Sequence, residues 1–207
     1  MHVGKENDKG KEKLSLSEDA LISASGLSKT RRPLHMTVTE WQTALRKQMA
    51  EKSEFEITNT GTGGAYSDYT VYNPVTRSKY KVAIRSRDNS LNYCSCYDFK
   101  TNQLGTCKHI EAILRKIDND PILKELISEP YTPAYSSMYM EYRGERKIMF
   151  RIGTENSDEI SSLLKPYLKP DGSLNKIGYA SIDKILAKAF QINPGFRCYE
   201  DALEHII

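Results

Sequence analysis

The chain has 207 residues, of which 39% are hydrophobic and 28% are charged, and its formal net charge is +3. These values are typical of one or two globular domains. No apolar run approaches the length of a membrane-spanning helix, and the polar first residues lack the apolar centre of a secretory signal. We therefore expect a cytoplasmic protein that does not contact a membrane.

The distribution of polar residues divides the chain into three parts. Residues 1–33 are polar and charged, with three glycines and scattered apolar residues, which predicts a disordered tail. Residues 34–128 are expected to form the first folded module. After a linker that contains prolines, residues 135–207 form a second segment.

A helix is predicted at the start of the first module. Thr37 and Glu40 have the spacing of a capping box, in which the two side chains satisfy free amide groups at a helix start. Val38, Trp41 and Leu45 then recur at helical intervals. This pattern predicts a helix that ends near residue 52.

Strands are predicted next. Residues 54–58 and 66–72 are rich in β-branched and aromatic side chains, and a glycine-rich turn lies between them. Residues 78–86 alternate between apolar and basic side chains, and residues 91–96 are expected to pair with them in antiparallel fashion. Because strand side chains alternate between faces, the basic side chains should form one row. That row consists of Lys79, Lys81, Arg85 and Arg87.

The remaining chain predicts a mixture of helices and strands. Apolar residues at positions 110, 113, 114 and 117 predict a helix that starts near residue 107. The other expected elements are a short helix at 121–128, a hairpin of 138–142 with 146–152, helices at 160–168 and 182–190, a strand at 196–199 and a helix from 201. The predicted class is therefore α+β, with a small antiparallel sheet and helices followed by a smaller α+β segment.

Four residues have the types and the spacing of a metal-binding knuckle. Cys94 and Cys96 are followed, after ten residues, by Cys107 and His109, which gives the pattern C-x-C-x10-C-x-H. Three thiolates and one imidazole suit the tetrahedral coordination of zinc. Four protein ligands leave no open position for a substrate, so we predict one structural Zn²⁺ ion that holds the sheet against the following helix.

Two other interpretations of these residues are open. The cysteines could be buried by packing next to an unrelated histidine, or they could form a redox pair. A redox pair is disfavoured because its usual motif is C-x-x-C, whereas this chain has C-x-C. If zinc is bound, the segment from about residue 79 to residue 117 should lose its fold without the metal, because binding and folding are then one equilibrium.

The same residues carry a resemblance to a known family. The pattern resembles the SWIM-type zinc finger, and residues 82–86, 92–102 and 104–112 are similar to the segment ahead of the motor in bacterial and phage Swi/Snf-family helicase-like ATPases. The close similarity covers about residues 38–117 and continues more weakly from residue 139. The resemblance implies zinc binding by the four residues above, and DNA binding or protein contact.

The chain departs from this family in one respect. It contains no G-x-x-x-x-G-K-[ST] phosphate loop, and nothing in it resembles the acidic metal-binding box of a motor. We therefore expect no ATPase activity and no other enzymatic activity. The chain would be either the N-terminal part of an ATPase, in which residues 135–207 lead toward a motor domain that is absent here, or a free-standing relative. A free-standing relative would bind the motor domain of a separate chain.

Positive charge is concentrated around the cysteines. Residues 77–117 include nine basic and three acidic residues, a local net charge of +6, which favours a polyanionic partner. DNA is the expected partner, which would make the protein nucleoid-associated. Tyr93 and Tyr97 are candidates for stacking on bases. The candidate phosphate-binding residues are Lys79, Lys81, Arg85, Arg87, Lys100, Lys108, Arg115 and Lys116.

Other functions remain as alternatives. The chain could be a protein–protein interaction adaptor without nucleic-acid binding, using the Trp41 helix and the second segment. Glu145 and Lys147 match the E-x-K part of a restriction-type nuclease site, and Mutator-like transposases also carry SWIM fingers. Neither a nuclease nor a transposase fragment has a visible catalytic constellation here. No small-molecule substrate is expected.

Overall fold

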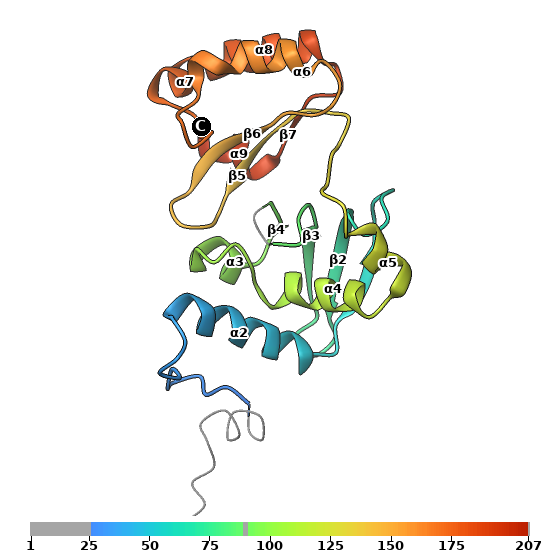
Figure 1. The fold of residues 1–207 in the computed structure, drawn as a ribbon. Helices are drawn as coiled ribbons and strands as arrows, with labels where there is room; N and C mark the ends of the chain where they lie inside the picture. The colour runs from blue at the N-terminus through green and yellow to red at the C-terminus, as the bar shows by residue number, and fades with distance from the viewer. Residues whose placement is uncertain (1–25, 89–90, 207) are drawn as a thin grey trace, which may run out of the picture.

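The computed structural model describes residues 26–88 and 91–206, which form two lobes (Figure 1). The first lobe, residues 26–128, contains α2 (Val38–Glu51), β1 (Glu56–Asn59), β2 (Asp68–Asn73), β3 (Ser78–Ala83), β4 (Tyr93–Cys94), α3 (Tyr97–Asn102), α4 (Lys108–Asp118) and α5 (Pro121–Leu126). The second lobe, residues 135–206, contains β5 (Ser137–Glu141), β6 (Lys147–Arg151), α6 (Ser157–Leu164), a 3-10 turn (Lys165–Tyr167), α7 (Lys176–Ala180), α8 (Ile182–Ile192), β7 (Arg197–Cys198) and α9 (Glu200–Ile206). The α+β class predicted from the sequence is confirmed.

The sheet of the first lobe has four antiparallel strands in the order β1-β2-β3-β4. Its inner face carries apolar side chains such as Val71 and Val82, which are fully or almost fully buried. Its outer face carries Lys79 opposite Tyr72 and Lys81 opposite Thr70. The predicted antiparallel pairing of the segments around Val82 and Cys94 is confirmed.

Helix α4 covers the inner face of this sheet. Ile110, Ile113 and Ile117 are at most 1% exposed, so the predicted apolar stripe is buried as expected. Burial of one such side chain contributes about 1.5–3 kcal/mol, and the stripe therefore anchors the helix on the sheet. The predicted short helix after it is α5, which begins at Pro121 and is capped by the Asp120 side chain.

Helix α2 packs beside α4 and begins with the predicted capping box. The Thr37 hydroxyl accepts from the Glu40 amide, and a Glu40 carboxylate oxygen accepts from the Thr37 amide at 2.7 Å. Part of the segment predicted to be a disordered tail lies against this helix, since the Trp41 indole donates to the Ser28 carbonyl at 3.0 Å. The rest of that predicted tail, residues 1–25, lies outside the described residues.

The second lobe contains a three-stranded mixed sheet in the order β6-β5-β7. The predicted hairpin is confirmed, with β5 antiparallel to β6, whereas β7 pairs in parallel with β5 through Ser137 and Met138. Helices α6, α7 and α8 lie on the side of this lobe away from the first lobe (Figure 1). None of the helices that the structure describes is both long enough and apolar enough to span a bilayer.

The two lobes share one continuous hydrophobic core. Tyr142, from the second lobe, packs its ring against Phe99 of the first lobe with 4.7 Å between ring centroids. Backbone contact reinforces this junction, because the Gly144 amide donates to the Gln103 carbonyl at 3.0 Å. The lobes are therefore joined by a packed interface as well as by the linker.

Candidate metal centre

Four side chains from β4 and from the starts of α3 and α4 meet at one point in the first lobe. Cys94 ends β4, Cys96 is the N-cap of α3, Cys107 is the N-cap of α4, and His109 lies in the first turn of α4. Their ligand atoms all lie within 4.8 Å of one another, and all four residues are buried. The structure thus brings together every residue of the predicted knuckle, in an arrangement that could hold a metal ion.

The ring of His109 is held in a defined orientation. It stacks on Tyr80 with 4.1 Å between centroids and contacts Phe55 at 5.1 Å. Its Nδ1 atom lies 3.7 Å from the sulfur of Cys94 and 3.8 Å from that of Cys107. Its other nitrogen, Nε2, is buried and has no hydrogen-bond partner among the described residues. Because Nδ1 is the nitrogen that lies beside the sulfurs, it is the atom of His109 that could bind a metal together with them.

The three thiols influence one another strongly. Hydrogen bonding with the other two cysteines, together with burial, holds the pKa of Cys94 well above its ordinary value. Burial raises the pKa of Cys107. Hydrogen bonds from the Cys107 and Cys94 thiols lower the pKa of Cys96, whose sulfur also accepts from the Phe99 amide at 3.4 Å. A cation bound here would replace the protons and favour the thiolate form of all three.

A tight loop brings the second ligand pair back to the first. Gln103 and Gly105 both have positive φ values, 58° and 71°, a conformation that glycine adopts readily. The Asn102 side chain donates to the Thr106 carbonyl at 2.8 Å, and the Thr106 hydroxyl donates to Glu111 on α4 at 2.6 Å. These bonds fix Cys107 at the start of α4.

The predicted basic row is interrupted by Arg85. The expectation that Arg85 is exposed beside Lys79 and Lys81 is wrong, because β3 ends at Ala83 and Arg85 is only 5% exposed. Its guanidinium is 2.6 Å from the Asp68 carboxylate and donates to the Ser67 carbonyl at 3.1 Å. Arg85 is therefore a structural residue and cannot contact a phosphate on the surface.

The other candidate basic residues lie on two sides of the first lobe. Lys79 and Lys81 are on the outer face of the sheet, whereas Arg115 and Lys116 are on α4, which covers the inner face. Several of them already have partners. Arg87 pairs with Asp118 at 2.8 Å, Lys116 donates to the Ile57 carbonyl at 3.1 Å, and the Lys108 amine lies 5.8 Å from the centroid of the Phe55 ring.

The two tyrosines proposed for base stacking have different environments. Tyr97 is 82% exposed, whereas Tyr93 is half-buried and packs its ring edge against Phe99 at 5.9 Å. Sequence reasoning missed a third tyrosine, Tyr72, which lies directly opposite Lys79 on the outer face. Only the register between β2 and β3 brings these two residues together.

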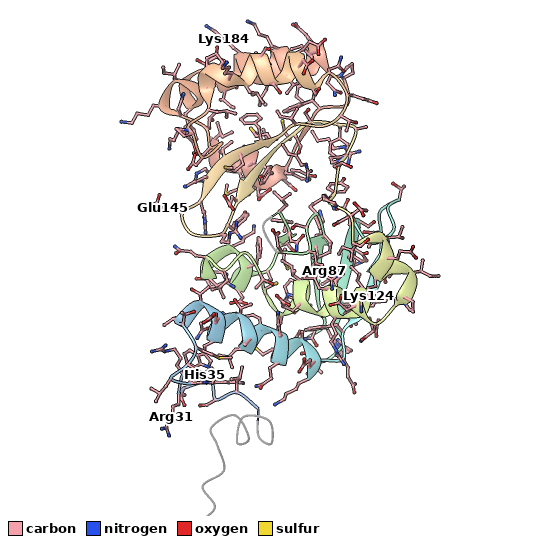
Figure 2. All side chains as sticks on the ribbon, in the orientation of Figure 1. Arg31, His35, Arg87, Lys124, Glu145 and Lys184 are labelled. Carbon is pink, nitrogen blue, oxygen red and sulfur yellow. The ribbon has the colours of Figure 1, made fainter. Side chains whose placement is uncertain are left out.

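The E-x-K triplet lies at the tip of the β5–β6 hairpin. Glu145 is exposed in the turn (Figure 2), and the Lys147 amine pairs with Asp171 at 2.9 Å. Within the described residues, the cysteine–histidine cluster is the one group of three or more candidate metal ligands, so the acidic side chains here do not form another.

Comparisons of this chain with protein-family models, with curated proteins and with solved structures find no match.

Proposed function

We propose that this chain is a zinc-stabilised module of the SWIM type that binds nucleic acid, with DNA as the main partner. The observation that carries the proposal is the buried Cys94, Cys96, Cys107 and His109 cluster, which lies beneath a sheet whose outer face carries exposed lysines. The metal would shape the module, and the sheet face would contact the phosphates.

The donor set and the spacing support zinc as the metal. Zinc–sulfur bonds of about 2.3 Å and zinc–nitrogen bonds of about 2.0–2.1 Å, in a tetrahedron, place sulfur and nitrogen about 3.6 Å apart. The Nδ1 atom of His109 lies 3.7 and 3.8 Å from two of the sulfurs, close to that value. Three thiolates and one imidazole are also a common donor set of structural zinc sites.

The role of the zinc would be structural. Four protein ligands complete a tetrahedron, so no position is left for water or a substrate. The ligands come from β4 and from the starts of α3 and α4. One ion would therefore fasten the edge of the sheet to both helices, and its binding would be coupled to the folding of this region.

The outer face of the sheet is the proposed nucleic-acid surface. Lys79 and Lys81 are exposed there, and neither side chain has an ion-pair partner elsewhere in the described chain. Tyr72 and Thr70 stand beside them on β2. Lysines would contact phosphates, and a half-exposed tyrosine ring offers a surface on which a base can stack.

Docking of a helicase-like ATPase motor, in cis or in trans, is the second candidate function. The supporting observation is the apolar surface of the second lobe, where Ile177 is 64% and Phe190 is 43% exposed. These residues lie on α7 and α8, away from the outer face of the first-lobe sheet. A protein contact there is compatible with nucleic-acid binding by the first lobe.

A salt titration of DNA binding tests the proposal. Each phosphate contact on duplex DNA contributes about −0.9 to the slope of log K against log salt, and each contact on a single strand about −0.7. The double variant Lys79→Gln/Lys81→Gln should therefore flatten the slope by roughly 1.8 on duplex or 1.4 on single-stranded DNA. Metal analysis of the same preparations should find one zinc per chain.

The control removes two lysines from a distant helix. Lys184 lies on the far side of α8 from the first lobe (Figure 2), and Lys188 is exposed on the same helix. Lys184→Gln/Lys188→Gln lowers the net charge equally but should leave the slope unchanged. Equal slopes for the wild type and the Lys79/Lys81 variant would show that this face does not bind the phosphates.

A further inference from the structure

An open groove lies between the outer face of the first-lobe sheet and the second lobe. Its volume is about 420 Å³, which is within the range of about 300–1,000 Å³ that is usual for sites that bind small organic molecules. The first lobe forms one wall of the groove and the second lobe forms the other. The polar and aromatic residues of its lining include Asp68, Thr70, Lys81, Tyr93, Tyr199 and Glu200.

This groove is continuous with the face proposed to contact phosphates. Lys81 belongs to both, and it lies opposite Thr70, which also lines the groove. Lys79 lies two residues earlier on the same strand, about 7 Å from Lys81. A strand whose phosphates lie on Lys79 and Lys81 would therefore pass the mouth of the groove, and one of its bases could point into it.

Carboxylates in the lining make the groove unsuitable for a phosphate but suitable for a base. Asp68, Glu200 and Asp201 all line it, and their negative charges would repel an anion. Asp68 pairs with Arg85, but its side chain is still 57% exposed, and Glu200 is exposed at the start of α9. Exposed carboxylate oxygens accept hydrogen bonds from amino groups, and cytosine and adenine carry such groups on their rings. The phosphate would stay at Lys81, and the neutral base would enter the groove.

Two tyrosines supply aromatic surface to the groove. Tyr93 comes from β4 of the first lobe, and Tyr199 lies between β7 and α9 of the second lobe. Both are partly exposed, and the Tyr199 hydroxyl accepts from Nε of Arg85 at 3.4 Å, which ties this wall of the groove to the first lobe. Aromatic rings bind bases of any sequence by stacking, because every base has a π-face. The groove thus offers stacking surface and acceptors for a base, next to a cation for its phosphate.

Only an unpaired base can enter a groove of this kind without cost. In a duplex each base is stacked and paired, and its extrusion requires energy for unstacking and unpairing, whereas the bases of a single strand are free to turn outward. We propose that the interlobe groove binds one unpaired base of a single strand whose phosphates lie on Lys79 and Lys81. This inference rests on the proposed function, and it adds that single-stranded nucleic acid is the substrate class of the site.

A strand that lacks bases tests the proposal on the unaltered protein. A labelled single-stranded DNA of mixed adenine and cytosine is compared with an abasic strand of the same length, and both are titrated with the zinc-loaded wild type. The strand with bases should bind about 5-fold to 150-fold more tightly, which is the range for stacking of one base on an aromatic ring. The two strands should show the same salt dependence, because they carry the same phosphates.

Substitutions of Tyr199 locate the base in the groove. Tyr199→Leu removes one of the two rings and should lower the preference for the strand with bases severalfold, while its affinity for a duplex of the same length stays that of the wild type. Tyr199→Phe keeps the ring and should keep the preference. The matched control is Tyr179→Leu, because Tyr179 is a 38% exposed tyrosine on α7 that is not part of the described groove lining. It should bind all three ligands like the wild type.

The outcomes separate this inference from the proposed function. If the wild type binds both single strands equally and in a salt-sensitive way, the groove does not bind a base, but the phosphate-binding face still stands. An undiminished preference in folded Tyr199→Leu protein also overturns the inference. If neither single strand nor the duplex binds at low salt, the proposed function fails, and the inference fails with it. The abasic comparison needs no variant, so it decides the matter even where a substitution of Tyr199 destabilises the protein.

Discussion

Replacement of Cys96 by serine isolates the contribution of the metal from that of local structure. The sulfur of Cys96 accepts a hydrogen bond from the Phe99 amide at the start of α3, and serine is a preferred residue at that capping position. The variant therefore keeps the cap and loses one metal ligand. The other three ligand residues are untouched.

The size of the effect follows from the number of ligands. Structural zinc sites bind with apparent free energies of about 10–16 kcal/mol, so one ligand of four accounts for about 3 kcal/mol. That loss corresponds to roughly 150-fold weaker zinc binding. For a chain of this size, where 1 kcal/mol shifts Tm by about 2–4 °C, the zinc-loaded variant should melt roughly 6–12 °C below the wild type.

Thermal melts with stoichiometric zinc, repeated with excess chelator, measure this difference. Hydrogen exchange should locate the loss of protection in β4, α3 and the first turn of α4, where the ligands lie. The control is Cys198→Ser, because Cys198 is a half-buried thiol in β7 outside the cluster. It should keep its zinc and respond to chelator like the wild type.

Two results would refute the reasoning about the metal centre. One is a Cys96→Ser protein that binds zinc as tightly as the wild type and melts within about 2 °C of it. The other is a wild-type protein whose melting temperature and exchange pattern do not respond to complete removal of the metal. Either result would mean that apolar packing alone holds the first lobe together.

Three further predictions concern other parts of the molecule, and urea unfolding measures each of them. Thr37→Ala removes the cap of α2 and should cost about 1 kcal/mol, whereas Thr39→Ala, on the exposed first turn, should be close to neutral. Tyr142→Phe removes the hydroxyl that donates to Asp201 and should cost about 1–2 kcal/mol; unchanged stability would contradict a contribution of this bond to the stability of the second lobe. Burial raises the pKa of Asp201 above 3.8, so ionisation of this residue opposes folding, and stability is lost as pH rises through the folded-state pKa. Asp201→Asn keeps an acceptor for Tyr142 and should be more stable than the wild type at pH 7, and this advantage should vanish at pH values below 3.8. An advantage that persists at low pH would show that ionisation of Asp201 does not cause the difference.

Features set by local sequence patterns were predictable in this chain. Helix α4 was predicted because four apolar residues at helical spacing need one buried face, and the capping box predicted the start of α2. The cluster that could hold a metal was predictable for a related reason. Metal ligands must be particular residue types at short spacing, so Cys94, Cys96, Cys107 and His109 stand out in the sequence before any fold is known.

Features set by contacts between distant segments were not predictable. Arg85 continues the alternation of β3 in sequence, but the strand ends two residues earlier, and the partner that holds Arg85 inside is Asp68 on β2. Helix α3 is short and polar, and it depends on Cys96 as its cap and on burial of Phe99. The pairing of Tyr72 with Lys79 likewise has no signal in the local sequence.

The position of His109 between Tyr80 and Phe55 has a spectroscopic consequence. Circulating electrons in the two neighbouring rings generate local magnetic fields, and the imidazole protons that lie within those fields resonate away from their free-histidine frequencies. With only four histidines in the chain, this displaced pair of signals would be easy to recognise. A proton spectrum could then follow the closure of the knuckle directly, as metal is added, without any label on the protein.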